Sequence, residues 1–292
     1  MSTAFEGKVV AITGAGKGLG RAYALHFAAL GASVVVNNRR HAGEVESSAD
    51  RVVGEIASAG GKAVANYSAV EHPEAGGSLL AAALENFGRF DCLIANAGIT
   101  EGKSFRKQSL QELREVLEVN LMGTINVVHP AFCHLCEQKS GSVVVSTSSA
   151  GLFGEFGLPA YSTSKAGLIG LMRSLSLEAA PKNVQVNAIA PYAATQMTED
   201  HLSTEIGAAM DPQRVAPVVE WLASGAVSGE VLLAGGGKVA RARMQTSRVM
   251  SASDLLGDDE QQLQRIVIDQ EFESAGENFQ QFAAAFGNRG NS

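Results

Sequence analysis

The feature that most constrains the fold is a glycine-rich turn near the start of the chain. Lys8–Thr13 is a short apolar run typical of a buried parallel strand, and a helical period resumes over Arg21–Leu30. The turn between them has the spacing T-G-x-x-x-G-x-G over Thr13–Gly20. Glycines allow a tight turn and a close approach of the backbone to a phosphate, and the following helix presents free N–H groups and a positive dipole end.

This strand–turn–helix unit predicts a site for the phosphates of a dinucleotide. The alternative is that the glycines serve only the close packing of a helix on a strand. We expect these residues of the turn to contact the cofactor: Gly14, Gly16, Lys17, Gly18, Leu19 and Gly20.

The alternation of strand and helix continues along most of the chain. Further strands are expected at residues 33–37, 62–66, 91–95, 142–146, 184–189 and 230–233. Helices are expected at residues 44–58, 74–87, 111–138, 160–178 and 212–224. Strands separated by helices predict an α/β protein with a single doubly wound parallel sheet, a Rossmann fold, whose ligands bind beyond the carboxyl ends of the strands.

Residues 1–237 are expected to form this Rossmann domain, and residues 238–292 a C-terminal extension outside the sheet. Within the extension, residues 254–268 and 271–286 have the apolar period of helices. The second helix is expected to carry one aromatic face, made of Phe272, Phe279, Phe282 and Phe286. We expect this face to pack on its own domain or on a partner subunit, because a single helix cannot bury it alone.

A tyrosine and a lysine four residues apart indicate acid–base chemistry. Tyr161 and Lys165 lie one turn apart on the same face of the expected helix, and Ser148 follows the preceding strand. A free tyrosine has a pKa of about 10. An ammonium about 4 Å away favours the phenolate by roughly 4 kcal/mol at an effective dielectric constant of about 20, on the order of three pK units. We therefore expect Tyr161 to exchange a proton with a substrate whose oxygen Ser148 orients; the alternative is a surface pair without a function.

The end of the second strand predicts which nicotinamide cofactor binds. A dinucleotide fold usually has an acidic residue there, which binds the adenosine ribose hydroxyls. This chain instead has Asn37, Asn38, Arg39 and Arg40. An uncharged side chain followed by arginine accepts a 2′-phosphate through charge-assisted hydrogen bonds, and Lys17 supplies a second cation. Asn38 and Arg39 therefore favour NADP(H) over NAD(H), unless they form only a solvated basic turn.

Charge and cysteine content argue against several other classes of protein. The net charge is −7 and no block of lysine and arginine is present, which argues against a nucleic-acid partner. No apolar run is long enough to span a membrane and no signal peptide precedes Lys8, so the cytoplasm is the expected location. Cys133 and Cys136 form a C-x-x-C motif inside a helical pattern. Without a second ligand pair nearby, we expect them to be buried thiols and not metal ligands.

Together these motifs resemble the short-chain dehydrogenase/reductase family from about Phe5 to Gly236. The matched motifs are T-G-x-x-x-G-x-G at Thr13–Gly20, N-A-G at Asn96–Gly98, a helical asparagine at Asn120, a serine at Ser148 and Y-x-x-x-K at Tyr161–Lys165. Within the family, the chain is most similar to the (3R)-hydroxyacyl-CoA dehydrogenase branch. That similarity is carried by Gly18–Asn37, Gly60–Tyr67, Ala190–Thr198 and Arg214–Leu222.

The resemblance implies a role for each matched residue. Tyr161 would be the acid–base group, and Lys165 would lower its pKa and bind the nicotinamide ribose. Ser148 would hold the substrate oxygen, and Asn120 would anchor a water that lets Lys165 exchange protons with solvent. The implied cofactor contacts also include Tyr161, Lys165, Asn96, Ala97, Gly98 and Pro191.

Three positions depart from the family pattern. Asn38 stands where an acid is usual, Ser68 stands where an acidic residue contacts adenine, and Tyr192 follows Pro191 where a glycine is usual. The first departure removes the basis for inferring an NAD preference from the family.

The implied reaction interconverts a secondary alcohol and a ketone by hydride transfer to or from NAD(P), with 3-hydroxyacyl-CoA as the expected substrate. An apolar alcohol such as a hydroxysteroid is the alternative. A regulator that only senses nucleotides is a minor alternative, because it would not need both Tyr161 and Lys165. We also expect a small-molecule substrate and a homodimer or homotetramer. We expect no metal, nucleic acid or membrane partner.

Overall fold

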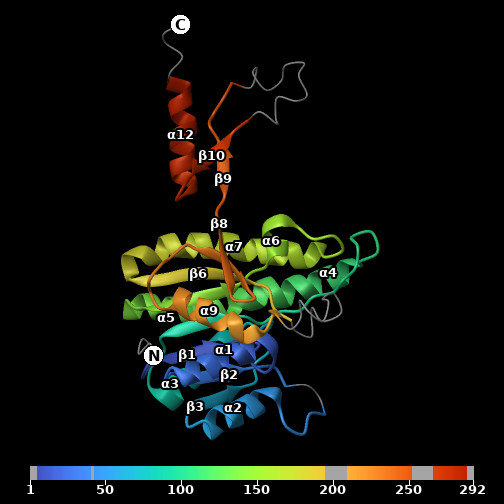
Figure 1. Ribbon diagram of the computed structural model, residues 1–292, viewed down its shortest axis with the longest axis vertical. Helices are drawn as coiled ribbons and strands as arrows, with labels where there is room; N and C mark the ends of the chain where they lie inside the picture. Colours follow the sequence, from blue (N-terminus) through green and yellow to red (C-terminus); the bar gives the residue numbers. More distant parts are fainter. Residues whose placement is uncertain (1–4, 41–42, 195–208, 252–265, 288–292) are drawn as a thin grey trace. The chain divides into compact units, whose positions relative to one another are not determined.

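An eight-stranded sheet organises most of the chain (Figure 1), which we describe from a computed structural model over residues 5–40, 43–194, 209–251 and 266–287. The strand order is β3-β2-β1-β4-β5-β6-β7-β8. The pairings from β3 through to β7 are all parallel. The strands are β1 (Val9–Ile12), β2 (Ser33–Asn37), β3 (Lys62–Asn66), β4 (Cys92–Ala95), β5 (Gly141–Ser146), β6 (Val184–Pro191), β7 (Val231–Gly235) and β8 (Lys238–Ala242).

Helices connect successive parallel strands, which confirms the predicted α/β class and doubly wound sheet. The main helices are α1 (Gly18–Ala29), α2 (Ser48–Ser58), α3 (Ala75–Phe87), α4 (Leu110–Leu117), α5 (Gly123–Gln138), α6 (Ser149–Phe153), α7 (Pro159–Ala179) and α9 (Ala216–Ala223). A π-helical turn, η1 (Glu118–Met122), joins α4 to α5, and 3₁₀ turns lie at η2 (Ala180–Lys182) and η4 (Pro212–Arg214).

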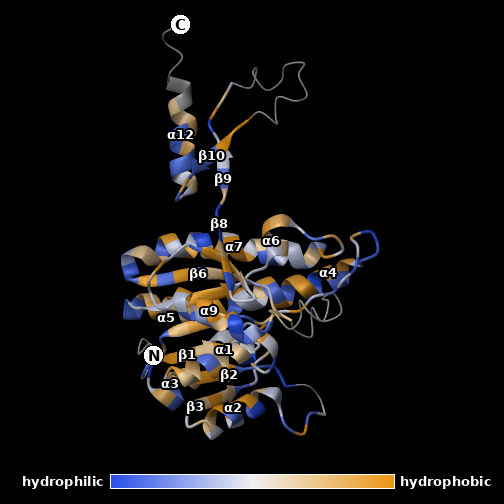
Figure 2. Ribbon diagram, viewed as in Figure 1, coloured by the Kyte–Doolittle hydropathy of each residue, from blue (hydrophilic) through white to orange (hydrophobic). Residues whose placement is uncertain are grey.

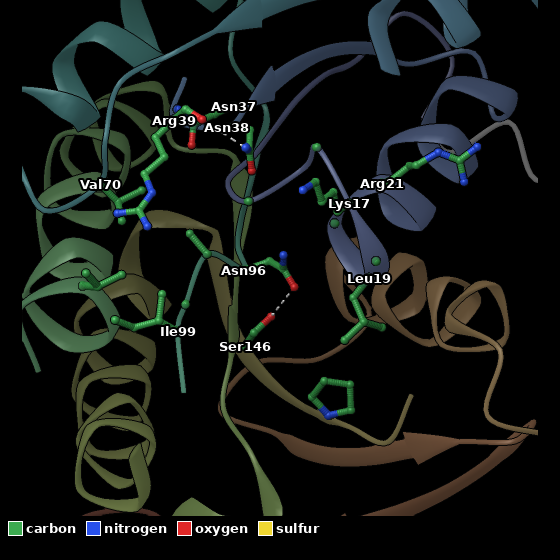
Figure 3. A pocket seen from close by; sticks show the side chains of 18 of the residues that line it. Lys17, Leu19, Arg21, Asn37, Asn38, Arg39, Val70, Asn96, Ile99 and Ser146 are labelled. Atoms are coloured by element: carbon green, nitrogen blue, oxygen red, sulfur yellow. Dashed lines mark hydrogen bonds between the residues drawn. The ribbon is translucent and has the colours of Figure 1, made fainter. Parts of the chain in front are cut away.

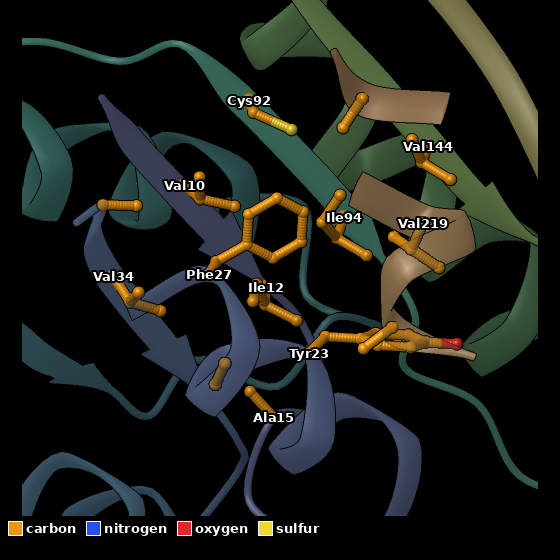
Figure 4. Close-up of a cluster of buried hydrophobic side chains, with 14 of the residues drawn as sticks. Val10, Ile12, Ala15, Tyr23, Phe27, Val34, Cys92, Ile94, Val144 and Val219 are labelled. Carbon is orange, nitrogen blue, oxygen red and sulfur yellow. The ribbon is translucent and has the colours of Figure 1, made fainter. Parts of the chain in front are cut away.

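The buried strands carry apolar side chains toward both faces of the sheet, as expected for parallel strands covered by helices. All four residues of β1 are buried, and Figure 2 shows the apolar residues concentrated along the strands. On one face, Tyr23 and Phe27 of α1 and Val219 of α9 pack against Ile12 and neighbouring strand residues (Figure 4). This core holds α1, and hence the glycine-rich turn before it, in a fixed position on the sheet.

Two expected helices have different boundaries in the structure. The helix predicted at 44–58 begins only at Ser48, because the Ser47 hydroxyl accepts the Asp50 N–H at 3.1 Å and caps it. The helix predicted at 111–138 is interrupted at η1. Its start is a capping box, in which Ser109 and Glu112 each bond the other's backbone N–H.

The expectation that the sheet ends before residue 238 is wrong, because β8 is its eighth strand. Gly236 and Gly237 have φ angles of 56° and 75°, which other residues rarely adopt, and they turn the chain from β7 into β8. The chain divides into two compact units, residues 1–241 and 242–292, which are described separately.

In the second unit, β9 (Gln245–Ser247) pairs antiparallel with β10 (Ile268–Glu271), followed by α12 (Ala275–Gly287). The expected helix at 254–268 lies largely outside the described residues, and Ile268 begins β10. The expected helix at 271–286 begins four residues later than predicted. Phe279 and Phe282 are 69% and 49% exposed within this structure. Among the described residues, no helix is both long and apolar enough to cross a membrane.

Candidate active site

A cleft of about 740 Å³ lies at the carboxyl ends of the central strands (Figure 3). Every residue expected to contact the cofactor lines it: Gly14, Gly16, Lys17, Gly18, Leu19, Gly20, Asn38, Arg39, Asn96, Ala97, Gly98, Tyr161, Lys165 and Pro191. Ser148 and Asn120 do not line it, but both contact residues that do. The fold therefore brings together segments that are widely separated in the sequence.

The glycine-rich turn leaves no room for side chains at two positions. A Cβ on Gly20 would collide with the Gly14 carbonyl, and a Cβ on Gly16 would collide with the Ser48 hydroxyl. Lys17 is the N-cap of α1, and its side chain makes no capping hydrogen bond. The first N–H groups of α1 thus have no side-chain cap, which is the arrangement that binds a phosphate.

Thr13 joins the turn to the end of β4. Its buried Oγ1 accepts the N–H groups of Asn96 and Ala97, both at 3.0 Å. Asn96 Nδ2 donates to the Thr13 carbonyl at 3.1 Å, and its Oδ1 accepts the Ser146 hydroxyl at 3.4 Å. These bonds hold the ends of β1, β4 and β5 together and fix the Asn96–Gly98 segment in the cleft wall.

The residues after β2 are held by neighbouring side chains. Asn38 Nδ2 donates to the Ser48 hydroxyl at 2.8 Å, and Arg39 Nη1 donates to Glu71 Oε1 at 3.3 Å. The Arg40 guanidinium lies 6.0 Å from the Tyr67 ring centroid. Both arginines of the predicted 2′-phosphate site therefore have partners within the described structure.

Tyr161 and Ser148 meet beside the cleft. Ser148 is the N-cap of α6, where its Oγ accepts the Ala150 N–H at 3.2 Å, and it also forms a hydrogen bond with the Tyr161 hydroxyl. Burial raises the pKa of Tyr161, and the bond from Ser148 only partly opposes that rise. The phenol is therefore held in its protonated form.

Lys165 is 4% exposed, and its Nζ donates to the Ser146 carbonyl at 2.7 Å. Burial lowers its pKa to about 8. The Nζ lies 5.6 Å from the Tyr161 ring centroid. The expectation that the pKa of Tyr161 is lowered is therefore wrong for this arrangement, because burial of the phenol raises it.

Asn120 lies in the π-helical turn η1 and is fully buried. Its Oδ1 accepts the Ile99 N–H at 2.7 Å, and its Nδ2 donates to the Ile99 carbonyl at 2.8 Å and to Ser164 Oγ at 3.2 Å. Asn120 Oδ1 and Lys165 Nζ both border Gly98, since a Cβ on Gly98 would lie 3.2 Å and 3.4 Å from them. Single π-helical turns inside α-helices occur frequently at functional sites.

Sequence reasoning missed three residues that shape the site: Glu71, Ser146 and Ser164. Ser146 is the last residue of β5 and the first of a run of hydroxyl residues, and it could have been suspected from that position. Ser164 and Glu71 carried no comparable signal, because each acts through a partner distant in the sequence.

The expectation that Cys133 and Cys136 are buried was wrong. Cys133 is exposed and Cys136 is half-buried, because their positions in α5 face away from the sheet side that Leu135 and Ala131 cover. Within the described ranges, no group of three or more histidine, cysteine, aspartate or glutamate side chains could hold a metal ion.

The donor set fits a dinucleotide. The uncapped start of α1 and the glycine-rich turn suit a diphosphate. Lys165 and Tyr161 line the same cleft and supply its reactive groups. A ligand that has phosphates in its middle and a reactive group at one end would fit this arrangement of residues.

Comparison with known proteins agrees with this arrangement. The sequence profile described as short chain dehydrogenase matches residues 8–206. A short-chain type dehydrogenase/reductase of Mycobacterium tuberculosis is 44% identical over 242 residues, which cover 81% of this chain and 85% of that protein. Mouse peroxisomal multifunctional enzyme type 2 is 43% identical over 222 residues, 75% of this chain but only 30% of that longer protein. The crystal structure of a short chain dehydrogenase from Mycobacterium avium superposes with a TM-score of 0.78 at 35% identity, covering 88% of this chain and 93% of that one.

Proposed function

The chain belongs to the short-chain dehydrogenase/reductase family and is an NAD(P)-dependent oxidoreductase acting on a CH–OH group; from that premise we propose that it interconverts 3-hydroxyacyl-CoA and 3-oxoacyl-CoA, with NADP(H) as the preferred cofactor. The observation that supports the substrate is the 43% identity with peroxisomal multifunctional enzyme type 2. The sequence motifs of this chain resemble the dehydrogenase domain of that enzyme. The match covers 30% of that protein, so its further activities are not assigned to this chain.

In the proposed mechanism, the bound nicotinamide supplies or accepts the hydride. Tyr161 donates its hydroxyl proton to the substrate oxygen during reduction and takes it back during oxidation. Ser148, already bonded to the Tyr161 hydroxyl, orients that oxygen. Lys165, whose Nζ is fixed by the Ser146 carbonyl and lies 5.6 Å from the Tyr161 ring centroid, would bind the nicotinamide ribose.

Asn120 is proposed to complete the proton path. Its Oδ1 and the Lys165 Nζ approach Gly98 from the same side, 3.2 Å and 3.4 Å from the point that a Cβ on residue 98 would occupy. A water there would accept from Lys165 and donate to Asn120. The approach of Asn120 Oδ1 and Lys165 Nζ to Gly98 supports the role that the family resemblance implies for Asn120.

The NADP(H) preference is proposed from the charges after β2. Arg39 lines the cleft with Asn38, which carries no charge to repel a 2′-phosphate. Lys17 lines the same cleft from the glycine-rich turn. Charge-assisted hydrogen bonds from an arginine contribute roughly 1.5–3 kcal/mol each, which corresponds to about ten- to a hundredfold in affinity.

A homodimer or homotetramer is proposed from the exposed face of α7. Ala166 and Gly170 are exposed on that face, and Leu177 is 50% exposed. Small residues there allow a second helix to approach closely, and Leu177 supplies apolar area for it to bury.

A steady-state panel tests the proposed function. NAD⁺ and NADP⁺ are each combined with (3R)- and (3S)-3-hydroxyacyl-CoA, a hydroxysteroid and a simple secondary alcohol. We expect the highest kcat/KM for the (3R)-thioester with NADP⁺. A higher kcat/KM for the steroid or the simple alcohol would overturn the substrate, and a higher value with NAD⁺ would overturn the cofactor preference.

A further inference from the structure

Glu71 lies at the adenosine end of the cleft, where the motifs did not identify a functional residue. It lines the cleft together with Arg39, and Arg39 Nη1 donates to its Oε1 at 3.3 Å. Figure 3 shows the Arg39 side chain extending from the end of β2 toward Val70, the residue before Glu71. The pair thus joins the turn after β2 to the turn after β3.

The Glu71 backbone is held independently of this ion pair. Asn126 Nδ2, from α5, donates to the carbonyls of Val70 and Glu71 at 3.1 Å and 3.3 Å. Val70 is 6% exposed and packs so closely on α5 that a Cβ on Gly123 would lie 2.8 Å from its Cγ2. The carboxylate is therefore not needed to build the turn.

The two side chains differ in freedom. The Arg39 side chain is 46% exposed and the Glu71 side chain 24%. Arg39 is the longer and more exposed partner, so it is the one that can turn toward a ligand. An ion pair at this level of exposure is weak, roughly 0.2–1 kcal/mol, and a ligand can displace it.

We infer that Glu71 sets the balance between NADP(H) and NAD(H), by pairing with Arg39 and by placing a negative charge beside the 2′-phosphate position. This inference rests on the proposed assignment of Arg39 to the adenosine ribose. A 2′-phosphate must take Arg39 from Glu71 and accept a carboxylate as a neighbour, whereas NAD(H) requires neither change. Glu71 therefore limits the preference for NADP(H) that Arg39 and Lys17 would otherwise create.

The test is Glu71→Gln, which keeps the size of the side chain and removes its charge. Dissociation constants for NADPH and NADH are measured by fluorescence titration at fixed ionic strength for wild type, Glu71→Gln and Arg39→Ala. We expect Glu71→Gln to bind NADPH about two- to fivefold more tightly, with NADH binding changed less than twofold. Arg39→Ala should weaken the binding of NADPH and leave the binding of NADH nearly unchanged.

Glu74→Gln is the matched control, because Glu74 is an exposed acid in the same turn that does not line the cleft. It should change neither constant. The inference is overturned if Glu71→Gln leaves NADPH binding unchanged, or if NADPH and NADH respond equally. A wild type that prefers NADH would overturn the proposed cofactor preference alone, because the selective gain of Glu71→Gln for NADPH remains measurable.

Discussion

Tyr161 is held protonated by its surroundings, and the proposed reaction uses that proton. We expect Tyr161→Phe to reduce kcat at least a thousandfold, within the range of about 10²–10⁴ or more that proton transfer contributes. Cofactor binding should stay within about twofold of wild type, because only the hydroxyl is removed. Single-turnover kinetics and NADPH titration measure both. Activity above about a tenth of wild type would exclude Tyr161 as the acid–base group.

Lys165 predicts the pH dependence of reduction. Burial lowers its pKa to about 8, so it is charged below that pH and becomes neutral as the pH rises through it. If the ammonium is the active form, kcat/KM for ketone reduction is constant at lower pH and falls above about 8. An arginine stays charged, so the residual activity of Lys165→Arg should lose this fall. A fall at the same pH in Lys165→Arg would assign it to another group.

Gly98 tests the proposed proton path. A methyl group in Gly98→Ala would lie 3.2 Å from Asn120 Oδ1 and 3.4 Å from Lys165 Nζ, in the space proposed for a water. We expect kcat to fall about a hundredfold, the lower end of the range of about 10²–10⁴ for a proton-transfer contribution. Gly102→Ala is the control, since no atom lies within 4 Å of its added Cβ. Equal activity in the two variants would remove the water from the mechanism.

At the scale of elements, Thr13 is the side chain that joins β1 to β4. Thr13→Val leaves the N–H groups of Asn96 and Ala97 without their acceptor. Each of the two unsatisfied donors costs roughly 1–3 kcal/mol, so we expect the free energy of unfolding to fall by about 2–6 kcal/mol. Thr13→Ser keeps the hydroxyl and should lose only about 1 kcal/mol. Urea unfolding compares the two, and equal losses would show that the methyl group matters more than the hydrogen bonds.

The elements also show where sequence patterns stop being informative. The strands of the parallel sheet were predictable because a strand buried on both faces requires a continuous apolar run. The interruption at η1 was not, because one π-helical turn hardly disturbs an apolar period of 3.6 residues. β8 was missed because the pattern of an exposed edge strand resembles that of a loop: four of its five residues are exposed.

At the scale of the whole molecule, the exposed face of α7 predicts self-association. Gly170→Arg places a long charged side chain on this face and should convert a dimer to a monomer, or a tetramer to a smaller species. Gly77→Arg on α3 is the matched control, since neither glycine has an atom within 4 Å of an added Cβ. Size-exclusion chromatography with light scattering measures the mass. An unchanged mass in Gly170→Arg would exclude α7 as the interface.

The site residues were predictable where several of them lie close together in one segment of the sequence. The glycine-rich turn and Tyr161–Lys165 are such segments, and all their expected cofactor contacts line one cleft. Glu71 was not predictable, because its meaning depends on a partner 32 residues away in the chain. The pKa of Tyr161 was predicted in the wrong direction, because spacing along a helix indicates proximity to a charge but not the extent of burial.

The contact among Gly16, Asn38 and Ser48 has a consequence for engineering. The hydrogen bond from Asn38 to Ser48 runs through the place that a side chain on residue 16 would occupy. A change at residue 38 alone also removes the donor to Ser48, so its effect on cofactor choice is mixed with damage to the turn. Libraries that vary one codon at a time will therefore undervalue position 38. Randomising residues 38 and 48 together, with glycine kept at 16, gives directed evolution a direct route to altered cofactor use.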